Sequence, residues 1–232
     1  MLELRGISAG YDTGQVLHDI TLVVPDHSVV ALLGANGAGK TTLLRVASGL
    51  LSPTAGQIVI DGEDVTDRPA HHLARLGVCH VPEGRGVFPA LTVSDNIRMQ
   101  AASEGKRSAM ASVADVFPRL GERAGQLAGT MSGGERQMLA LAHAYVGEPS
   151  VALLDEVSMG LAPNIVDEIY VYLHGLAEKG TALLLVEQYV RRALDLADYV
   201  YVLDRGRIAF AGEPAELDDS AIIQSYLGAI PA

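Results

Sequence analysis

The sequence of 232 residues predicts an α/β fold with a mostly parallel sheet. The first observation is a set of short apolar runs at 29–33, 151–154 and 181–186, whose length and composition are typical of buried strands. The second observation is that helical patterns follow these runs, at 41–47, 163–177 and 190–197. The third is composition, because 49% hydrophobic and 19% charged residues are typical of a globular chain.

The first part of the chain predicts antiparallel strands. Residues 2–8 and 16–24 alternate between apolar and polar side chains, as half-buried strands do. Residues 9–15 contain two glycines and an aspartate, so they predict a turn between these strands. Tyr11 lies in the predicted turn, where it is either a surface aromatic or a platform on which adenine could stack.

The apolar run 29–33 leads into residues 34–41, which have the spacing G-x-x-x-x-G-K-T of a phosphate-binding P-loop. In such a loop, backbone N–H groups and the positive end of the following helix converge on a phosphate. Lys40 is expected to reach the outer phosphates, and Thr41 is expected to hold Mg²⁺ through its hydroxyl. The residues predicted to bind the nucleotide here are Gly34, Asn36, Gly37, Ala38, Gly39, Lys40, Thr41 and Thr42.

Further along, the chain changes from strands to helices. Residues 57–60 and 76–81 predict strands, with a short helix at 69–75 between them. Helical patterns then follow at 93–102, 108–117 and 135–145. We therefore predict a P-loop NTPase core with a mostly parallel sheet, an N-terminal antiparallel β subdomain and an inserted α-helical subdomain.

The expected organisation is a single domain that spans residues 1–232. Residues 1–83 and 151–232 are expected to form the nucleotide-binding core, and residues 84–150 the helical subdomain. Near the end of the chain, residues 199–210 predict a β-hairpin, and a short helix is predicted near 221–226.

Two acidic residues, Asp155 and Glu156, directly follow the apolar run 151–154. Carboxylates at the C-terminal edge of a parallel sheet point into the crevice where ligands bind. Asp155 is expected to accept the Mg²⁺ shell, and Glu156 to orient or deprotonate the water that attacks the γ-phosphate. The alternative is that both are solvated charges at a strand end, but the preceding P-loop favours the catalytic interpretation.

A second anion site is predicted where Ser132 opens the helix at 135–145. Serine is a common helix cap, and Gly133 and Gly134 leave the backbone N–H groups of the helix start exposed. Glu135 completes this segment. The alternative is a plain capped helix without a ligand.

In this order, the P-loop, the helical region, the Ser-Gly-Gly segment and the acidic pair resemble the ATPase subunit of ABC transporters over nearly the whole chain. The resemblance implies that ATP and Mg²⁺ are bound and that Tyr11 stacks on adenine. It also implies that residues 132–135 bind the γ-phosphate of an ATP held by a second ATPase subunit. The reaction would then be phosphoryl transfer to water at a composite site.

Several residues depart from the general pattern of this family. Glu83 and Glu135 stand where glutamines are usual, and Gln188 stands where a histidine is usual. By position, the resemblance still implies catalytic roles for Glu83 and Gln188 beside Glu156, and Glu83 would also be a Mg²⁺ ligand. Gln188 would contact the γ-phosphate in place of the histidine.

One branch of the family has a similar set of departures. Segments 82–85, 160–163 and 186–188 resemble the ATPases of branched-chain amino-acid importers of the LivF type, although Val157 departs even from that branch. A urea importer is the alternative within the branch. An exporter ATPase is less favoured because of Glu83 and Gln188.

The resemblance also implies partners, namely integral-membrane permease subunits and a second ATPase subunit. The second ATPase subunit would be a related longer chain or, in isolation, a copy of this one. An extracytoplasmic solute-binding protein would act indirectly, and Phe88 is expected to help form the socket for a permease helix rather than pack in its own core. The expected location is cytoplasmic, on the inner face of the membrane, because no apolar run reaches the roughly 18 residues of a span and no signal peptide is apparent.

Charge and cysteine content exclude other classes. A net charge of −11 argues against a nucleic-acid-binding surface and therefore against a regulatory ATPase that acts on DNA or ribosomes. The single cysteine, Cys79, lies in an apolar strand pattern and is expected to be a buried small side chain rather than a redox group.

Overall fold

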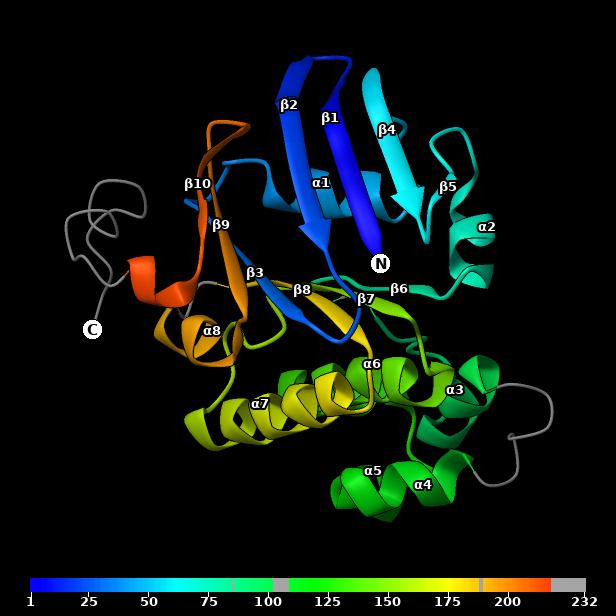
Figure 1. Cartoon of the computed structure of the whole chain (residues 1–232). Helices are drawn as coiled ribbons and strands as arrows, with labels where there is room; N and C mark the ends of the chain where they lie inside the picture. Colours follow the sequence, from blue (N-terminus) through cyan, green and yellow to red (C-terminus); the bar gives the residue numbers. More distant parts are fainter. Residues whose placement is uncertain (85, 102–108, 188–189, 218–232) are drawn as a thin grey trace.

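The structure is a computed structural model that describes residues 1–84, 86–101, 109–187 and 190–217. Within these residues, a six-stranded sheet separates a four-stranded antiparallel sheet from a group of helices (Figure 1). Five neighbouring strands of the larger sheet run parallel, so the predicted α/β fold with a mostly parallel sheet is confirmed.

The three apolar runs of the sequence are neighbours in the larger sheet. In spatial order its strands are β10 (Arg207–Gly212), β9 (Tyr199–Asp204), β3 (Val29–Leu33), β8 (Ala182–Val186), β7 (Val151–Asp155) and β6 (Val78–Val81). Every residue of β3, β7 and β8 is buried, as expected for strands that are covered on both faces. The predicted hairpin is β9 with β10, whose antiparallel pairing forms one edge of the sheet.

The first two strands are antiparallel as predicted, but the turn between them is shorter. β1 (Leu2–Tyr11) pairs with β2 (Gly14–Val24) up to the pair Tyr11↔Gly14, so only residues 12 and 13 turn the chain. The placement of Tyr11 in a turn is therefore wrong, because it is the last residue of a strand. The glycines of this segment take part in the ladder, which shifts its register after Ala9 instead of ending there.

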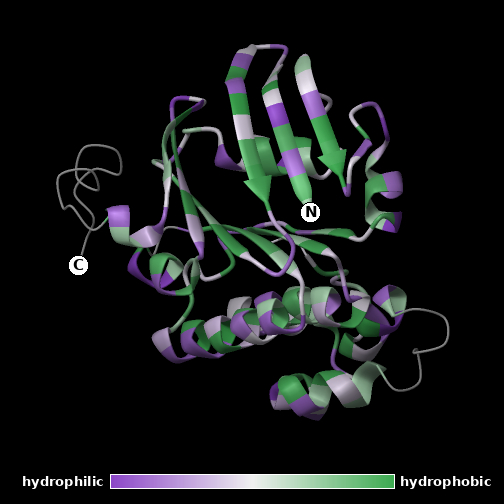
Figure 2. Ribbon diagram, viewed as in Figure 1, coloured by the Kyte–Doolittle hydropathy of each residue, from purple (hydrophilic) through white to green (hydrophobic). Residues whose placement is uncertain are grey.

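Alternate residues of the central strands enter two separate cores. Val30 and Leu32 of β3 join a core with the N-terminal sheet and α1 (Lys40–Ala47), whereas Ala31 and Leu33 join a core with the helices on the other face. Figure 2 shows the central strands largely hydrophobic and the outer helix faces more hydrophilic. Between α1 and β6, the chain forms β4 (Ala55–Ile60), β5 (Glu63–Asp64) and α2 (Ala70–Arg75).

The helical patterns are confirmed, with one helix more than predicted. The observed helices are α3 (Val93–Gln100), α4 (Ala109–Val116), α5 (Pro118–Glu122) and α6 (Gly133–Gly147). α5 was not predicted, since five residues are too few to show a helical period; its only sequence signal is Pro118 at the first helical position. Residues 102–108, in which the first predicted helix ends and the second begins, lie outside the described residues.

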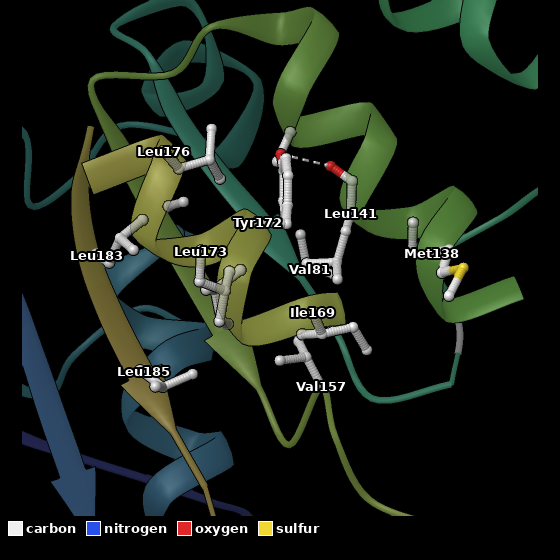
Figure 3. Packing of buried hydrophobic residues seen from close by; sticks show 14 of the residues in the cluster. Val81, Met138, Leu141, Val157, Ile169, Tyr172, Leu173, Leu176, Leu183 and Leu185 are labelled. Atoms are coloured by element: carbon white, nitrogen blue, oxygen red, sulfur yellow. Dashed lines mark hydrogen bonds between the residues drawn. The ribbon is translucent and has the colours of Figure 1, made fainter. Parts of the chain in front are cut away.

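Helix α6 is fixed to the central sheet through α7 (Pro163–Glu178). The hydroxyl of Tyr172 on α7 donates a hydrogen bond of 3.1 Å to the carbonyl of Leu141 on α6 (Figure 3). On the same helix, Leu173 and Leu176 lie near Leu183 of β8 (Figure 3). The arrangement gives the start of α6 a fixed position relative to the sheet edge.

The last elements are α8 (Val190–Leu196) and two short 3-10 turns at Ala128–Thr130 and Pro214–Leu217. The helix predicted near 221–226 lies outside the described residues. In the part of the chain that is described, no helix is long and apolar enough to cross a membrane. Cys79 is half-buried against the helix-side core, and burial raises the pKa of its thiol to about 11, so the thiol stays protonated near neutral pH.

Candidate nucleotide-binding site

The loop between β3 and α1 has the backbone that a P-loop requires. Gly37 and Gly39 have φ angles of 81° and 111°, in the left-handed region that favours glycine. A Cβ atom on Gly39 would lie 2.9 Å from Cδ2 of Leu17, so the loop also runs close against a side chain of β2. The sequence motif therefore corresponds to a constrained loop rather than to an ordinary turn.

A groove of about 400 Å³ opens in front of this loop. The predicted residues that line it are Asn36, Gly37, Gly39, Lys40, Thr41, Thr42, Glu83 and Glu156. Val16 and Met159 line it as well, although no motif in the sequence pointed to them. Gly34 and Ala38 are not among the lining residues. The carbonyl of Gly34 accepts a hydrogen bond from Nζ of Lys40, and Ala38 is buried in the core beside α1.

Lys40 lines this groove and is only 5% exposed. Its Nζ donates hydrogen bonds to the carbonyls of Gly34 at 2.8 Å and Ala35 at 3.2 Å, and it lies 3.8 Å from Oε1 of Glu156. Burial lowers the pKa of Lys40, while the carboxylates of Glu156 and Asp155 act in the opposite direction. The loop thus holds a cation where phosphate oxygens would arrive.

Thr41 and Asp155 meet beside Lys40. The hydroxyl of Thr41 donates a hydrogen bond of 3.4 Å to Oδ1 of Asp155, which ends β7 and is 3% exposed. Burial raises the pKa of Asp155; the bond from Thr41 lowers it, and the negative charges of Glu156 and Glu83 raise it further. A buried carboxylate crowded by other carboxylates would be stabilised by a bound cation.

These oxygen donors fit Mg²⁺. The ion is commonly held by one or two carboxylates together with phosphate oxygens of the substrate, rather than by a full set of protein ligands. Among the described residues, no group of three or more His, Cys, Asp or Glu side chains is arranged to hold a metal. A Mg²⁺ bound by Thr41, Asp155 and a nucleotide phosphate, with Glu83 on the same groove, agrees with that donor set.

Glu156 follows directly at the edge of the sheet. Its backbone N–H donates a hydrogen bond of 2.9 Å to the carbonyl of Val186, and its φ angle of 47° is unusual for a residue with a side chain. Val157, which departs from the sequence pattern, is fully buried in the helix-side core near Ile169 (Figure 3). Its apolar side chain therefore helps to fix the segment after Glu156.

Tyr11 lies in a different hollow from the predicted phosphate site. Its hydroxyl accepts a hydrogen bond of 3.1 Å from Nη1 of Arg45, and the residue is 41% exposed. It lines a groove of about 490 Å³ that also includes Gly10, Asp12, Gly14, Gln15, Leu51 and Thr54. Neither groove joins Tyr11 to the P-loop residues, so stacking on adenine stays a prediction.

Ser132 caps α6, as predicted, and Glu135 completes a capping box. The backbone N–H and the hydroxyl of Ser132 both donate to Oε2 of Glu135 at 2.9 Å, and the backbone N–H of Glu135 donates to the Ser132 hydroxyl at 3.3 Å. The bond from the backbone of Ser132 is the main reason that the pKa of Glu135 is lowered. The capping box at the start of this 15-residue helix therefore already uses the backbone N–H groups of Ser132 and Glu135.

Arg123 is a neighbour of this segment that no sequence motif indicated. Its Nη2 lies 3.1 Å from Oε1 of Glu135, which is the oxygen that Ser132 does not use. The described residues that line the P-loop groove include none of residues 132–135. The two predicted anion sites are therefore separate on one chain. Gln188, the third predicted catalytic residue, lies outside the described residues.

Comparisons with known proteins agree with this geometry. A family model described as ABC transporter matches residues 17–159. The chain is 42% identical over 232 residues to the high-affinity branched-chain amino acid transport ATP-binding protein BraG of Pseudomonas aeruginosa, across 98% of this chain and 100% of that protein. It is 37% identical over 221 residues to the probable branched-chain amino acid transport ATP-binding protein LivF of Archaeoglobus fulgidus, across 94% of each. A solved structure of an ATP binding subunit of an ABC transporter superposes with a TM-score of 0.85 at 27% identity, across 96% of this chain and 94% of that one.

Proposed function

This chain belongs to the ABC transporter family as one of its ATP-hydrolysing, ATP-binding subunits, and from that premise we propose that it drives the uptake of branched-chain or other hydrophobic amino acids. The observation that supports ATP hydrolysis is that Lys40, Thr41 and Glu156 line one groove, with Asp155 hydrogen-bonded to Thr41 beside it. The support for the substrate class is the near full-length similarity to two proteins named for branched-chain amino acid transport.

In the proposed mechanism, the phosphates of ATP lie on the backbone donors of residues 34–42 and against Nζ of Lys40. Thr41 and Asp155 would hold Mg²⁺, and Glu83 would be a further ligand. The bound ion would supply positive charge that offsets the charge of the phosphates. Glu156 orients the attacking water and takes its proton, so most of the rate enhancement comes from positioning and charge stabilisation.

The second half of the site is proposed to come from another ATPase subunit. Ser132, Gly133 and Gly134 would present the start of α6 to the γ-phosphate across the interface, with Glu135 holding Ser132 in place. The separation of the two anion sites on one chain supports this arrangement. Gln188 would be the contact to the γ-phosphate, and Tyr11 the stacking partner of adenine.

The proposed assembly places this chain on the inner face of the membrane through permease subunits. Residues 84–150 would form the helical subdomain that contacts the permease, and residues 1–83 and 151–232 the nucleotide-binding core. A related longer ATPase subunit would complete the dimer in the transporter, and a second copy of this chain would do so in isolation. A solute-binding protein outside the membrane would deliver the substrate.

The substrate class is tested by uptake of radiolabelled leucine and radiolabelled urea in cells with and without this chain. We expect leucine uptake to be lost without the chain and restored by the wild-type gene, while urea uptake is unchanged. Loss of urea uptake with intact leucine uptake would instead assign the chain to a urea importer. Affinity purification from solubilised membranes should recover integral-membrane subunits with the chain.

Phe88 is proposed to contact the permease, and its exposure supports this. Phe88 is 46% exposed, so the alternative that its ring packs in the core of its own subunit is wrong. Its backbone is fixed by the fully buried Asn96, which accepts from the Phe88 N–H at 2.8 Å and donates to its carbonyl at 3.0 Å. A fixed backbone with an exposed aromatic ring is typical of an anchor at an interface.

Phe88→Ala is expected to leave the melting temperature and the ATP turnover of the isolated subunit unchanged but to lower leucine uptake severalfold. The reason is that the ring adds little to the fold and would be lost only from the contact with the permease. Val171→Ala is the matched control, because Val171 is 75% exposed but lies on α7, outside the proposed permease-contacting residues 84–150. A large fall in melting temperature, or normal uptake, would count against the proposed contact.

Arg123→Ala is expected to lower ATP turnover by about twofold to fivefold, since exposed ion pairs contribute up to about 1 kcal/mol. Without Arg123, the Glu135 carboxylate would be less well neutralised next to the incoming γ-phosphate. Glu135→Gln in the same background removes that charge and should restore much of the turnover. Arg98→Ala, which breaks an exposed pair with Asp95 on α3, should have no effect. Equal turnover in Arg123→Ala and wild-type protein would contradict the role given to Arg123.

A further inference from the structure

The backbone on both sides of Glu156 is held by two consecutive residues: Val186, the last residue of β8, and Glu187, which follows it. Before the turn, the N–H of Glu156 donates to the carbonyl of Val186. After the turn, Ser158 donates twice to the carboxyl group of Glu187: its backbone N–H to Oε1 at 3.1 Å and its hydroxyl to Oε2 at 2.6 Å. Val186 and Glu187 thus fix the chain immediately before and after the predicted general base.

This second attachment is completely enclosed. Ser158 is 0% exposed and Glu187 is 2% exposed, and a buried carboxyl group is retained only where its hydrogen bonds are satisfied. Tyr170 of α7 faces the same carboxyl group: burial raises the pKa of the Tyr170 hydroxyl, and the charge of Glu187 raises it further. The pair therefore lies in the interior between β8, α7 and the segment that follows Glu156.

The backbone of Glu156 needs such support. Its φ angle of 47° lies in the left-handed region, which is unfavourable for a residue with a Cβ and persists only where the surrounding contacts impose it. The following turn is closed by a hydrogen bond of 3.2 Å from the N–H of Met159 to the carbonyl of Glu156. If Ser158 were released, Glu156 could return to an extended conformation, which would move its carboxylate away from Lys40, now 3.8 Å away.

We propose that Glu187 is a positioning residue for catalysis: its buried carboxyl group holds Ser158 and thereby fixes the strained backbone that directs Glu156 at the γ-phosphate. This inference rests on the proposed function, because it assumes that Glu156 acts on the water that attacks ATP. Glu187 itself does not touch the nucleotide. Its effect is therefore on the catalytic step and not on the affinity for ATP.

The test measures kcat, KM for ATP and melting temperature of the full-length chain for wild type, Glu187→Gln, Glu187→Ala, Ser158→Ala and the double alanine variant. Glu187→Ala should lower kcat by roughly tenfold to a hundredfold, because a displacement of about 1 Å can cost a hundredfold in rate. KM should stay within about twofold, since the P-loop contacts are unchanged. Glu187→Gln should recover most of kcat, because an amide can accept from the Ser158 N–H and donate to its hydroxyl oxygen.

The double variant should be no slower than Glu187→Ala alone, because both changes remove the same contact. Should Glu187→Ala fail to fold, Ser158→Ala still decides the question, since it removes only the hydroxyl contact and should lower kcat about threefold to tenfold at constant KM. Wild-type kcat in Ser158→Ala, a raised KM in place of a lowered kcat, or no recovery in Glu187→Gln would overturn the proposal. A wild-type chain that hydrolyses no ATP would instead refute the proposed function itself.

Discussion

Glu156→Gln is expected to lower ATP turnover by roughly a hundredfold to ten-thousandfold while ATP still binds. The amide keeps the size and shape of the side chain but cannot take the proton of the attacking water. Lys40, Thr41 and the loop glycines remain in place, so the affinity for ATP should stay within a few fold. Because ATP would persist, the variant should accumulate as a dimer, visible as an ATP-dependent doubling of mass in light scattering.

Glu148→Gln is the matched control for this substitution. Glu148 has a φ angle of 43°, close to that of Glu156, but it lies at the C-terminal end of α6, away from the groove. The Glu148→Gln variant should turn over ATP at the wild-type rate. That result would show that the loss of activity in Glu156→Gln comes from the lost carboxylate and not from a glutamine at a positive φ angle. Rapid ATP hydrolysis by Glu156→Gln would contradict the catalytic role of Glu156 and favour the alternative that it is a solvated charge at a strand end.

Lys40→Ala is expected to weaken ATP binding by roughly tenfold to a hundredfold and to lower turnover by at least as much. Charge-assisted hydrogen bonds contribute about 1.5–3 kcal/mol, and about 1.4 kcal/mol corresponds to tenfold in affinity. The Nζ of Lys40 is buried and held by the carbonyls of Gly34 and Ala35. The other described lysine, Lys179, lies at the end of α7 and does not line the groove, so it cannot replace Lys40. Binding can be followed by isothermal titration with a non-hydrolysable ATP analogue.

Lys179→Ala is the control for the loss of a lysine. Lys179 lies at the end of α7, where its Nζ is 4.5 Å from the centre of the Tyr145 ring. This variant should bind the ATP analogue as the wild type does. If Lys40→Ala bound the analogue equally well, the groove at the P-loop would not be the phosphate site.

Local sequence signals predicted the parts of the site that depend on one short segment. The P-loop is fixed by glycine conformations within residues 34–39, and the capping box requires only Ser132 and Glu135, three positions apart. Their positions could therefore be predicted without knowledge of the fold. The apolar runs predicted the buried strands for the same reason.

Other features depend on contacts between distant segments, which a single sequence does not show. Ser158 and Glu187 are 29 residues apart and meet only because β7 and β8 pair in parallel. Likewise, Arg123 reaches Glu135 only through the packing of the turn after α5 against the start of α6. Tyr11 was misplaced because a strand with register shifts accommodates glycines that otherwise predict a turn.

A mixture of two inactive variants shows whether two subunits share one ATP. Lys40→Ala disables the P-loop but keeps the start of α6 intact. Gly133→Asp does the reverse: it places a negative charge where the γ-phosphate of the partner's ATP would lie. A Cβ on Gly133 meets nothing within 4 Å and an acid suits a helix start, so the fold should be preserved.

Each variant alone should be nearly inactive, but a heterodimer contains one complete site, formed by the P-loop of one chain and residues 132–134 of the other. Random pairing in an equal mixture makes about half of the dimers heterodimers. Each heterodimer has one working site out of two, so turnover should return to about a quarter of the wild-type rate. The measurement is phosphate release by the two purified variants, separately and mixed. Recovery on mixing is the predicted result, and a mixture as inactive as its components would contradict a site shared between two chains.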